Sequence, residues 1–188
     1  MPLNITIRST TVDDLVTITD VHTLGFGYEK EARLTAALLA DATATPTVSL
    51  LALHDGAPVG HILFTRVRLN GRDDPLLHIL APLAVTPEYQ RKGVGGALIR
   101  NGIEKLRSMG SKLVFVLGHK EYYPRHGFTL HALRHGYQPP YPIPEENSAY
   151  WMFQPLTPEA VNIETGILQC ADALHHPAHW RDDGGAEI

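Results

Sequence analysis

The chain has 188 residues, 44% of them hydrophobic and 19% charged, which is the composition of one compact globular domain. A formal net charge of -4 at pH 7 excludes the broad basic field that attracts nucleic acid or an anionic membrane. The single cysteine, Cys170, excludes an intramolecular disulfide, and no apolar run reaches the roughly 20 residues of a spanning helix, so we expect a cytoplasmic protein.

The first elements are predicted from their hydrophobic periodicity. Residues 3–8 form a short strand, because apolar and polar side chains alternate there. Thr11 and Asp14 have the spacing of a capping box, and apolar residues then repeat at helical spacing. Residues 29–41 form a second helix, with its leucines gathered on one face.

From Val48 the pattern changes to strands joined by tight turns. Residues 48–54 and 58–69 are predicted to form a hairpin around the turn Asp55–Gly56. Residues 76–85 then form a central strand. Pro82 lies inside this strand, and because proline has no N–H to donate, the pairing must break or bulge there. The N-terminal half is therefore expected to be largely antiparallel.

The second half alternates between helical and extended segments. The predicted elements are a helix over 93–107, a buried strand over 113–117, a helical turn around Tyr122 and Tyr123, a strand beginning at Phe128, a loop over 134–148 and a last strand over 150–156. We assign one domain to residues 1–156 and a C-terminal extension that packs on it to residues 157–188. The last residues of this extension are expected to fray.

A glycine-rich segment opens the predicted helix over 93–107, directly after the central strand. Helix N-termini present unpaired N–H groups and a positive dipole end, so they bind anions. Gly93, Gly95 and Gly96 leave room for phosphate oxygens to approach the backbone, and Arg91 and Lys92 add positive charge at the rim. Because glycine destabilises a helix interior by roughly 0.5–1 kcal/mol relative to alanine, three glycines here favour a phosphate site over a simple tight connection.

Two other phosphate-binding motifs fit this segment less well. A P-loop requires Lys followed by Ser or Thr after its second glycine, and neither pair follows these glycines. A dinucleotide-binding fingerprint requires a third glycine inside a parallel βαβ unit. The segment from Gly93 lacks that glycine, and antiparallel hairpins precede it.

Two stretches carry a resemblance to a known family. Gln90-Arg-Lys-Gly-Val-Gly95, preceded by the strand end Leu83-Ala-Val-Thr-Pro87, is similar to the pyrophosphate-binding motif Gln/Arg-x-x-Gly-x-Gly/Ala of the GNAT N-acetyltransferases. Tyr122-Tyr-Pro-Arg-His-Gly-Phe128 resembles the Tyr-x-x-x-Gly-Phe element that follows the fifth strand of that family. The order of the predicted elements also matches the family over roughly residues 3–156.

The resemblance implies an α/β fold with a mixed central sheet of about seven strands, splayed between the fourth and fifth strands and flanked by helices. It implies acetyl-CoA as the acyl donor and no metal. The pantetheine arm would lie along Leu83, Ala84 and Val85, and a backbone N–H near Val85 would support the oxyanion. The residues implied in pyrophosphate binding are Gln90, Arg91, Lys92, Gly93, Val94, Gly95 and Gly96.

The resemblance further implies that Tyr123 protonates the departing CoA thiolate. A phenol suits this role because its ordinary pKa of about 10 exceeds that of the thiol, so it remains protonated at neutral pH. Tyr122 is the adjacent competitor for the role, and either tyrosine could instead serve only in packing.

The general base that deprotonates the amine is left open between Glu29, His61, His78, His119 and a water chain. Each protein candidate has an alternative explanation: His61 and His78 as ordinary sheet histidines, Glu29 as an acid at a helix start, and His119 as a solvent-facing side chain. Three further histidines, His175, His176 and His179, lie in a proline-containing, tail-like segment without cysteine or carboxylate partners, so no metal site is predicted.

The sequence thus favours an N-acetyltransferase that acts on a primary amine of a small molecule or protein, by direct attack in a ternary complex. The alternative is a non-catalytic, regulatory acyl-CoA-binding module. The acceptor is expected to be selected by loops around residues 22–33, 70–76 and 134–148, and a homodimer is compatible with the family.

Overall fold

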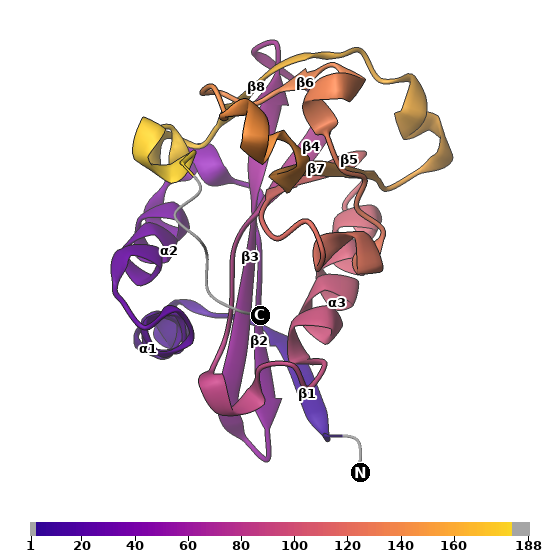
Figure 1. Ribbon diagram of the computed structural model, residues 1–188. Coiled ribbons are helices and arrows are strands. Elements are labelled where there is room, and N and C mark those ends of the chain that lie inside the picture. The colour runs from indigo at the N-terminus through magenta and orange to yellow at the C-terminus, as the bar shows by residue number, and fades with distance from the viewer. Residues whose placement is uncertain (1–2, 182–188) are drawn as a thin grey trace.

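An eight-stranded sheet runs through the molecule, and helices cover both of its faces (Figure 1). The computed structural model describes residues 3–181. Six strands are ordered β1-β2-β3-β4-β5-β7, while β8 pairs with β3 and with β6. Helices α1 and α2 lie on one face of the sheet and α3 lies on the other (Figure 1).

The elements of the N-terminal half are β1 (Ile5–Ser9), α1 (Leu15–Phe26), α2 (Lys30–Ala40), β2 (Val48–His54), β3 (Ala57–Leu69) and β4 (Arg72–Val85). Their pairing is antiparallel, as the sequence predicted. Strand β4 begins at Arg72 rather than at residue 76, because Asp73 pairs with Arg66 at 2.9 Å and with Arg68 at 2.6 Å across the hairpin. These ion pairs extend the ladder into the segment expected to be a loop.

The elements of the second half are α3 (Val94–Ser108), β5 (Leu113–Leu117), β6 (Tyr137–Gln138), β7 (Trp151–Pro155) and β8 (Gly166–Cys170). The strand predicted to begin at Phe128 is wrong. Phe128 is buried, but the segment makes only an isolated bridge between Thr129 and Phe153 before His131 adopts a left-handed conformation (φ 59°) and a 3-10 turn follows. Phe128 is thus buried, but the residues after it do not continue as a strand.

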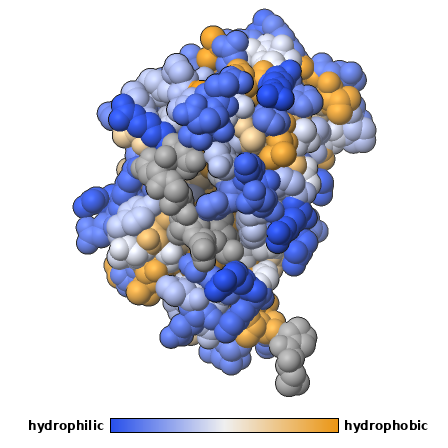
Figure 2. Space-filling model, in the orientation of Figure 1, coloured by the Kyte–Doolittle hydropathy of each residue, from blue (hydrophilic) through white to orange (hydrophobic). Residues whose placement is uncertain are grey.

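The core has two parts, one on each face of the sheet. Successive side chains of β3 point to opposite faces of the sheet, so Leu63 packs toward α2 while Ile62 and Phe64 pack toward α3. Helix α3 approaches closely at Gly102, where an added Cβ would overlap the Phe64 ring. The face of the molecule in Figure 2 is mostly hydrophilic, with small separate apolar patches.

Strands β4 and β5 run side by side for only part of their length. Their parallel register extends from Leu77 opposite Leu113 to Leu80 opposite Val116, after which β4 continues to Val85 without β5 beside it. On the other edge of β4, the register with β3 shifts between Ile62 and Phe64, where Ala81 and Pro82 oppose one residue. The predicted break at Pro82 is therefore confirmed, and it lies where the two strands part.

Three buried histidines connect elements within the core. His22 Nε2 lies 2.8 Å from His61 Nδ1, and His61 Nε2 lies 2.8 Å from Ser49 Oγ. His78 bonds Ser111 Oγ at 2.8 Å and the carbonyl of Pro46 at 2.9 Å. Burial disfavours the charged imidazolium, and it lowers the pKa of His22 to about 3 and that of His78 to about 4, with the pKa of His61 also well below its ordinary value.

We predict that the free energy of unfolding falls as the pH is lowered from 7 to 5. The unfolded chain binds protons at these histidines below about pH 6.5, whereas the folded protein keeps them neutral until about pH 4 at His78 and about pH 3 at His22. The unfolded state therefore gains stability as the pH falls, by about 2 kcal/mol per histidine at pH 5. Urea unfolding at both pH values measures this, and His78→Gln should reduce the difference. Equal free energies at pH 5 and pH 7 would contradict it.

Candidate active site

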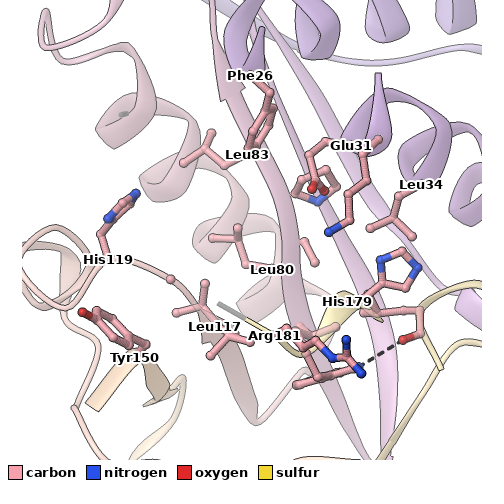
Figure 3. Close-up of a pocket in the computed structure, with 18 of the residues that line it drawn as sticks. Phe26, Glu31, Leu34, Leu80, Leu83, Leu117, His119, Tyr150, His179 and Arg181 are labelled. Carbon is pink, nitrogen blue, oxygen red and sulfur yellow. Dashed lines mark hydrogen bonds between the residues drawn. The ribbon is translucent and has the colours of Figure 1, made fainter. Parts of the chain in front are cut away.

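A cavity of about 360 Å³ lies where β4 and β5 part (Figure 3). One wall comes from residues 79–83 of β4 and residues 116–119 at the end of β5. The opposite wall comes from the region joining α1 to α2 and from a C-terminal segment that includes His179, Trp180 and Arg181. A cavity of this size and mixed lining is suited to a small ligand.

The β4 edge that borders this cavity has no strand partner among the described residues beyond Leu80. Leu83 lines the cavity, and Ala84 and Val85 are buried directly after it. The other edge of the same segment is paired with β3, from Ile62 opposite Leu83 to Gly60 opposite Val85. Backbone groups of β4 are thus available to a ligand that lies in the gap like an additional strand.

The glycine-rich segment lies at the start of α3, as the sequence predicted. Gly93 is the N-terminal cap with a φ of 88°, a left-handed conformation that favours glycine, and no side chain caps this helix. Gly95 and Gly96 are buried. A Cβ at Gly96 would come within 2.8 Å of the His126 ring, so this glycine allows close packing. The first N–H groups of α3 thus have no side-chain cap, and uncapped N–H groups at a helix start can accept an anion.

Gln90 has a role that its motif did not predict. Its side-chain amide donates to the carbonyl of Val85 at 3.0 Å and to that of Gly25 at 3.3 Å. Gly25 packs tightly on the same strand, since an added Cβ would lie 2.9 Å from the Val85 oxygen. Because Phe26 follows Gly25 and lines the cavity, Gln90 connects the end of β4 to the wall formed by α1.

Tyr123 lines the cavity, whereas Tyr122 is not among the lining residues. The Tyr123 ring is buried and rests against Gly118, where an added Cβ would collide with it. Burial raises the pKa of the Tyr123 phenol well above its ordinary value, and it raises the pKa of Tyr122 to about 12. Tyr123 is therefore a protonated phenol at the cavity wall over the whole physiological pH range.

Most of the candidate bases lie away from the cavity. Glu29 is exposed and pairs with Arg33 at 3.0 Å, and His61 and His78 are fully buried against protein partners. His119 does line the cavity, at the end of β5.

The carboxylate that sequence reasoning missed is Glu31, which lines the cavity from α2 (Figure 3). The signal was present in the helical spacing: Glu31 precedes the buried Leu34 and Leu38 by three and seven residues, so it lies on the inward stripe of α2.

The C-terminal segment contributes lining residues that no motif indicated. The segment 22–33 does reach the cavity, but residues 70–76 and 134–148 do not line it. Residues 181–188 were expected to fray; Arg181 lines the cavity, and residues 182–188 lie outside the described residues. Over residues 3–181, no group of three or more His, Cys, Asp or Glu side chains is placed to hold a metal ion, and no helix is long and apolar enough to cross a membrane.

The model of the acetyltransferase (GNAT) family matches residues 15–128, the part of the chain that contains the cavity strands, the glycine-rich segment and Tyr123. The chain belongs to the GNAT acetyltransferase family. Among its relatives, the uncharacterized N-acetyltransferase YjhQ of Escherichia coli K12 is 56% identical over 168 residues, which cover 89% of this chain and 92% of YjhQ. The uncharacterized N-acetyltransferase YhbS of the same strain is 32% identical over 145 residues, covering 77% of this chain and 83% of YhbS.

Two solved GNAT structures are similar to this chain over most of its length. The crystal structure of Escherichia coli YhbS in complex with CoA superposes with a TM-score of 0.83 at 27% identity, covering 99% of this chain and 97% of that one. A GNAT acetyltransferase from Brucella melitensis in complex with acetyl-CoA gives a TM-score of 0.72 at 29% identity, covering 91% and 98%. The family and the fold implied by the sequence are thereby confirmed.

We predict that Gln90→Ala loosens the junction between α1 and β4. Two buried carbonyls lose their donor, so the free energy of unfolding should fall by about 1–2 kcal/mol, and amide hydrogen exchange near Gly25 should accelerate. Arg91→Ala is the matched control, because it changes the neighbouring motif residue without removing a bond to either carbonyl. Equal stability of the Gln90→Ala and Arg91→Ala proteins would show that Gln90 does not act as this connection.

Proposed function

We propose that the protein transfers the acetyl group of acetyl-CoA to a primary amine while both substrates are bound. The observation that carries this proposal is the parting of β4 and β5, which brings an unpaired strand edge, the protonated Tyr123 and the Glu31 carboxylate to one cavity. The CoA and acetyl-CoA bound to the similar structures support the choice of donor. A cytoplasmic location belongs to the same proposal and is supported by Cys170, a buried free thiol.

The donor would be held by backbone groups over most of its length. The pantetheine arm would run along Leu83, Ala84 and Val85, and the pyrophosphate would lie against the N–H groups at Gly93–Gly96, with Arg91 and Lys92 at the rim. Leu83 lines the cavity, which supports an N–H of this strand end as the donor to the thioester carbonyl. Such an N–H stabilises the oxyanion that forms on attack. Gln90 would act indirectly, by holding Val85 and Gly25 in place.

The reaction requires two proton transfers, and the cavity offers a group for each. Glu31 would accept the proton that the ammonium must lose before its nitrogen attacks the thioester carbon, with His119 as the other titratable side chain on this path. As the carbon–sulfur bond breaks, Tyr123 would donate its phenolic proton to the CoA thiolate. Solvent then returns a proton to the phenolate, whose raised pKa favours its recovery.

A non-catalytic acyl-CoA-binding module is the second candidate. It would retain the glycine-rich start of α3 and the open edge of β4, but it would need no acid or base in the cavity. The burial of Tyr123 against Gly118 and the inward position of Glu31 favour the enzyme.

We predict that the purified protein releases CoA thiol from acetyl-CoA only when a primary amine is present. Tyr123→Phe should lower kcat by about a hundredfold and leave CoA affinity within about twofold, because the hydroxyl contributes to the departure of the thiolate. Tyr122→Phe is the matched control and should remain active, since Tyr122 does not line the cavity. Binding of CoA without thiol release across an amine panel would favour the regulatory module, and a failure to bind CoA at millimolar concentration would exclude both candidates.

We predict that Glu31→Gln lowers kcat/KM at pH 7 by about a hundredfold, and that raising the pH restores part of the rate because the amine then arrives neutral. Glu29→Gln removes the other carboxylate of this region, which is exposed and paired with Arg33, and it should behave as the unmodified protein does. The assignment of Glu31 as base would fail if the two variants had the same pH–rate profile.

A further inference from the structure

Three basic side chains gather at the first turns of α3, and none of them has a role in the proposed reaction. Arg100 belongs to α3 itself. Arg125 and His126 belong to the 3-10 turn that ends at His126 and packs on that helix. An added Cβ at Gly96 would lie 2.8 Å from His126 Cε1 and 3.3 Å from Arg100 Nη1. The two side chains therefore meet over the glycine-rich first turn of the helix.

Arg125 lies close enough to act on the same groups. Burial lowers the pKa of His126, and the charges of Arg100 and Arg125 lower this pKa further. The same two charges oppose the rise that burial causes in the pKa of Tyr122, whose ring centroid lies 4.8 Å from that of His126. Because salt and water screen charges over longer distances, both guanidinium groups must converge on this small surface.

No carboxylate balances the two arginines at this surface. Within residues 3–181, no ion pair involves Arg100 or Arg125, and both side chains are exposed. Elsewhere an exposed arginine lies against an acid, as Arg33 does against Glu29 at 3.0 Å. Like charges that are held together repel each other, so this surface is stabilised when an anion binds to it.

The chemistry of the donor indicates which anion this is. In the proposed function the diphosphate of CoA lies at Gly93–Gly96, and the chain of CoA continues from there into a ribose that carries the 3′-phosphate. Arg100 follows Gly96 by four residues, so it lies on the same face of α3 and about one turn further along. A phosphate monoester carries a charge of about −1.5 to −2 at neutral pH, which makes the 3′-phosphate the most highly charged single phosphate of CoA.

We propose that Arg100 and Arg125, with His126 beside them, bind the 3′-phosphate of CoA and thereby distinguish CoA from dephospho-CoA. This inference rests on the proposed function and specifies how the donor is selected. Guanidinium groups are suited to the task because each can donate two parallel hydrogen bonds to phosphate oxygens. An N–H of the His126 imidazole can add a further donor.

Dephospho-CoA tests the proposal directly, because it differs from CoA only by the absence of the 3′-phosphate. Isothermal titration calorimetry on the unmodified protein should give a Kd for CoA about ten- to thirtyfold lower than that for dephospho-CoA, the effect of charge-assisted contacts to one phosphate. This ratio should decrease as the salt concentration is raised, since contacts between exposed charges are screened.

Single substitutions then locate the contact. Arg100→Ala and Arg125→Ala should each raise the Kd for CoA by about three- to tenfold and leave the Kd for dephospho-CoA within about twofold. Both side chains are exposed, so the variants should fold. Lys105→Ala is the matched control, because it removes an exposed cation from the same helix beyond Arg100, and the ratio of the two Kd values should persist.

Two results would overturn the inference. One is equal affinity of the unmodified protein for CoA and dephospho-CoA. The other is an equal loss of affinity for both compounds in the two arginine variants, which would assign these side chains to the diphosphate instead. Neither result contradicts the proposed function if acetyl-CoA still releases its thiol in the presence of an amine. If neither compound binds, the proposed function fails, and the assignment of the 3′-phosphate fails with it.

Discussion

The site depends on the incomplete pairing of two parallel strands. β4 and β5 share a ladder only from Leu77 to Leu80, and beyond that point no strand of the described residues pairs with this edge of β4, while the register with β3 on the other edge shifts at Ala81 and Pro82. Unpaired backbone groups inside a protein are costly unless something binds them, so an open edge that borders a cavity is a binding surface. The buried Tyr123 and the wall that contains Glu31 both border this gap.

Close backbone approach keeps the parts of the site in position. Gly25 allows α1 to lie against the end of β4, and Gln90 reinforces the junction by bonding a carbonyl from each element. Gly118 performs the equivalent task for Tyr123, whose ring occupies the space that a side chain would fill. Gln90, which the motif placed at the phosphates, thus helps to fix the cavity wall formed by α1. One side chain therefore connects the segment before α3 with that wall.

In the proposed function, the donor and the acceptor would be recognised in different ways. The donor would be held by backbone N–H groups and glycines, which suit a cofactor shared by a whole family. The acceptor would meet side chains of α2 and of the C-terminal segment that line the cavity, among them Glu31, His179 and Arg181. The C-terminal lining residues lie beyond the matched family region of 15–128, so this part of the cavity wall is not set by the family pattern.

The sequence by itself determined the features that depend on neighbouring residues. Hydrophobic period located α1, α2, α3 and the strands β1 to β5 and β7, but it missed β6, which lies in the predicted loop over 134–148, and β8. Pro82 marked the break in β4, and the glycines at the start of α3 and the element containing Tyr123 indicated the family. The strand predicted to begin at Phe128 was wrong because one buried apolar residue does not require an extended run, and only an isolated bridge at Thr129 forms there. Only the tertiary structure decided which side chains face the cavity. His61 and His78 are enclosed in the core, and Arg181 lines a cavity together with Lys30, from which it is distant in sequence. The inward position of Glu31, by contrast, was already indicated by its helical spacing. Which of these side chains face the cavity depends on how the helices pack on the sheet and on where the C-terminal segment packs against the domain. Local sequence patterns carry little information about either.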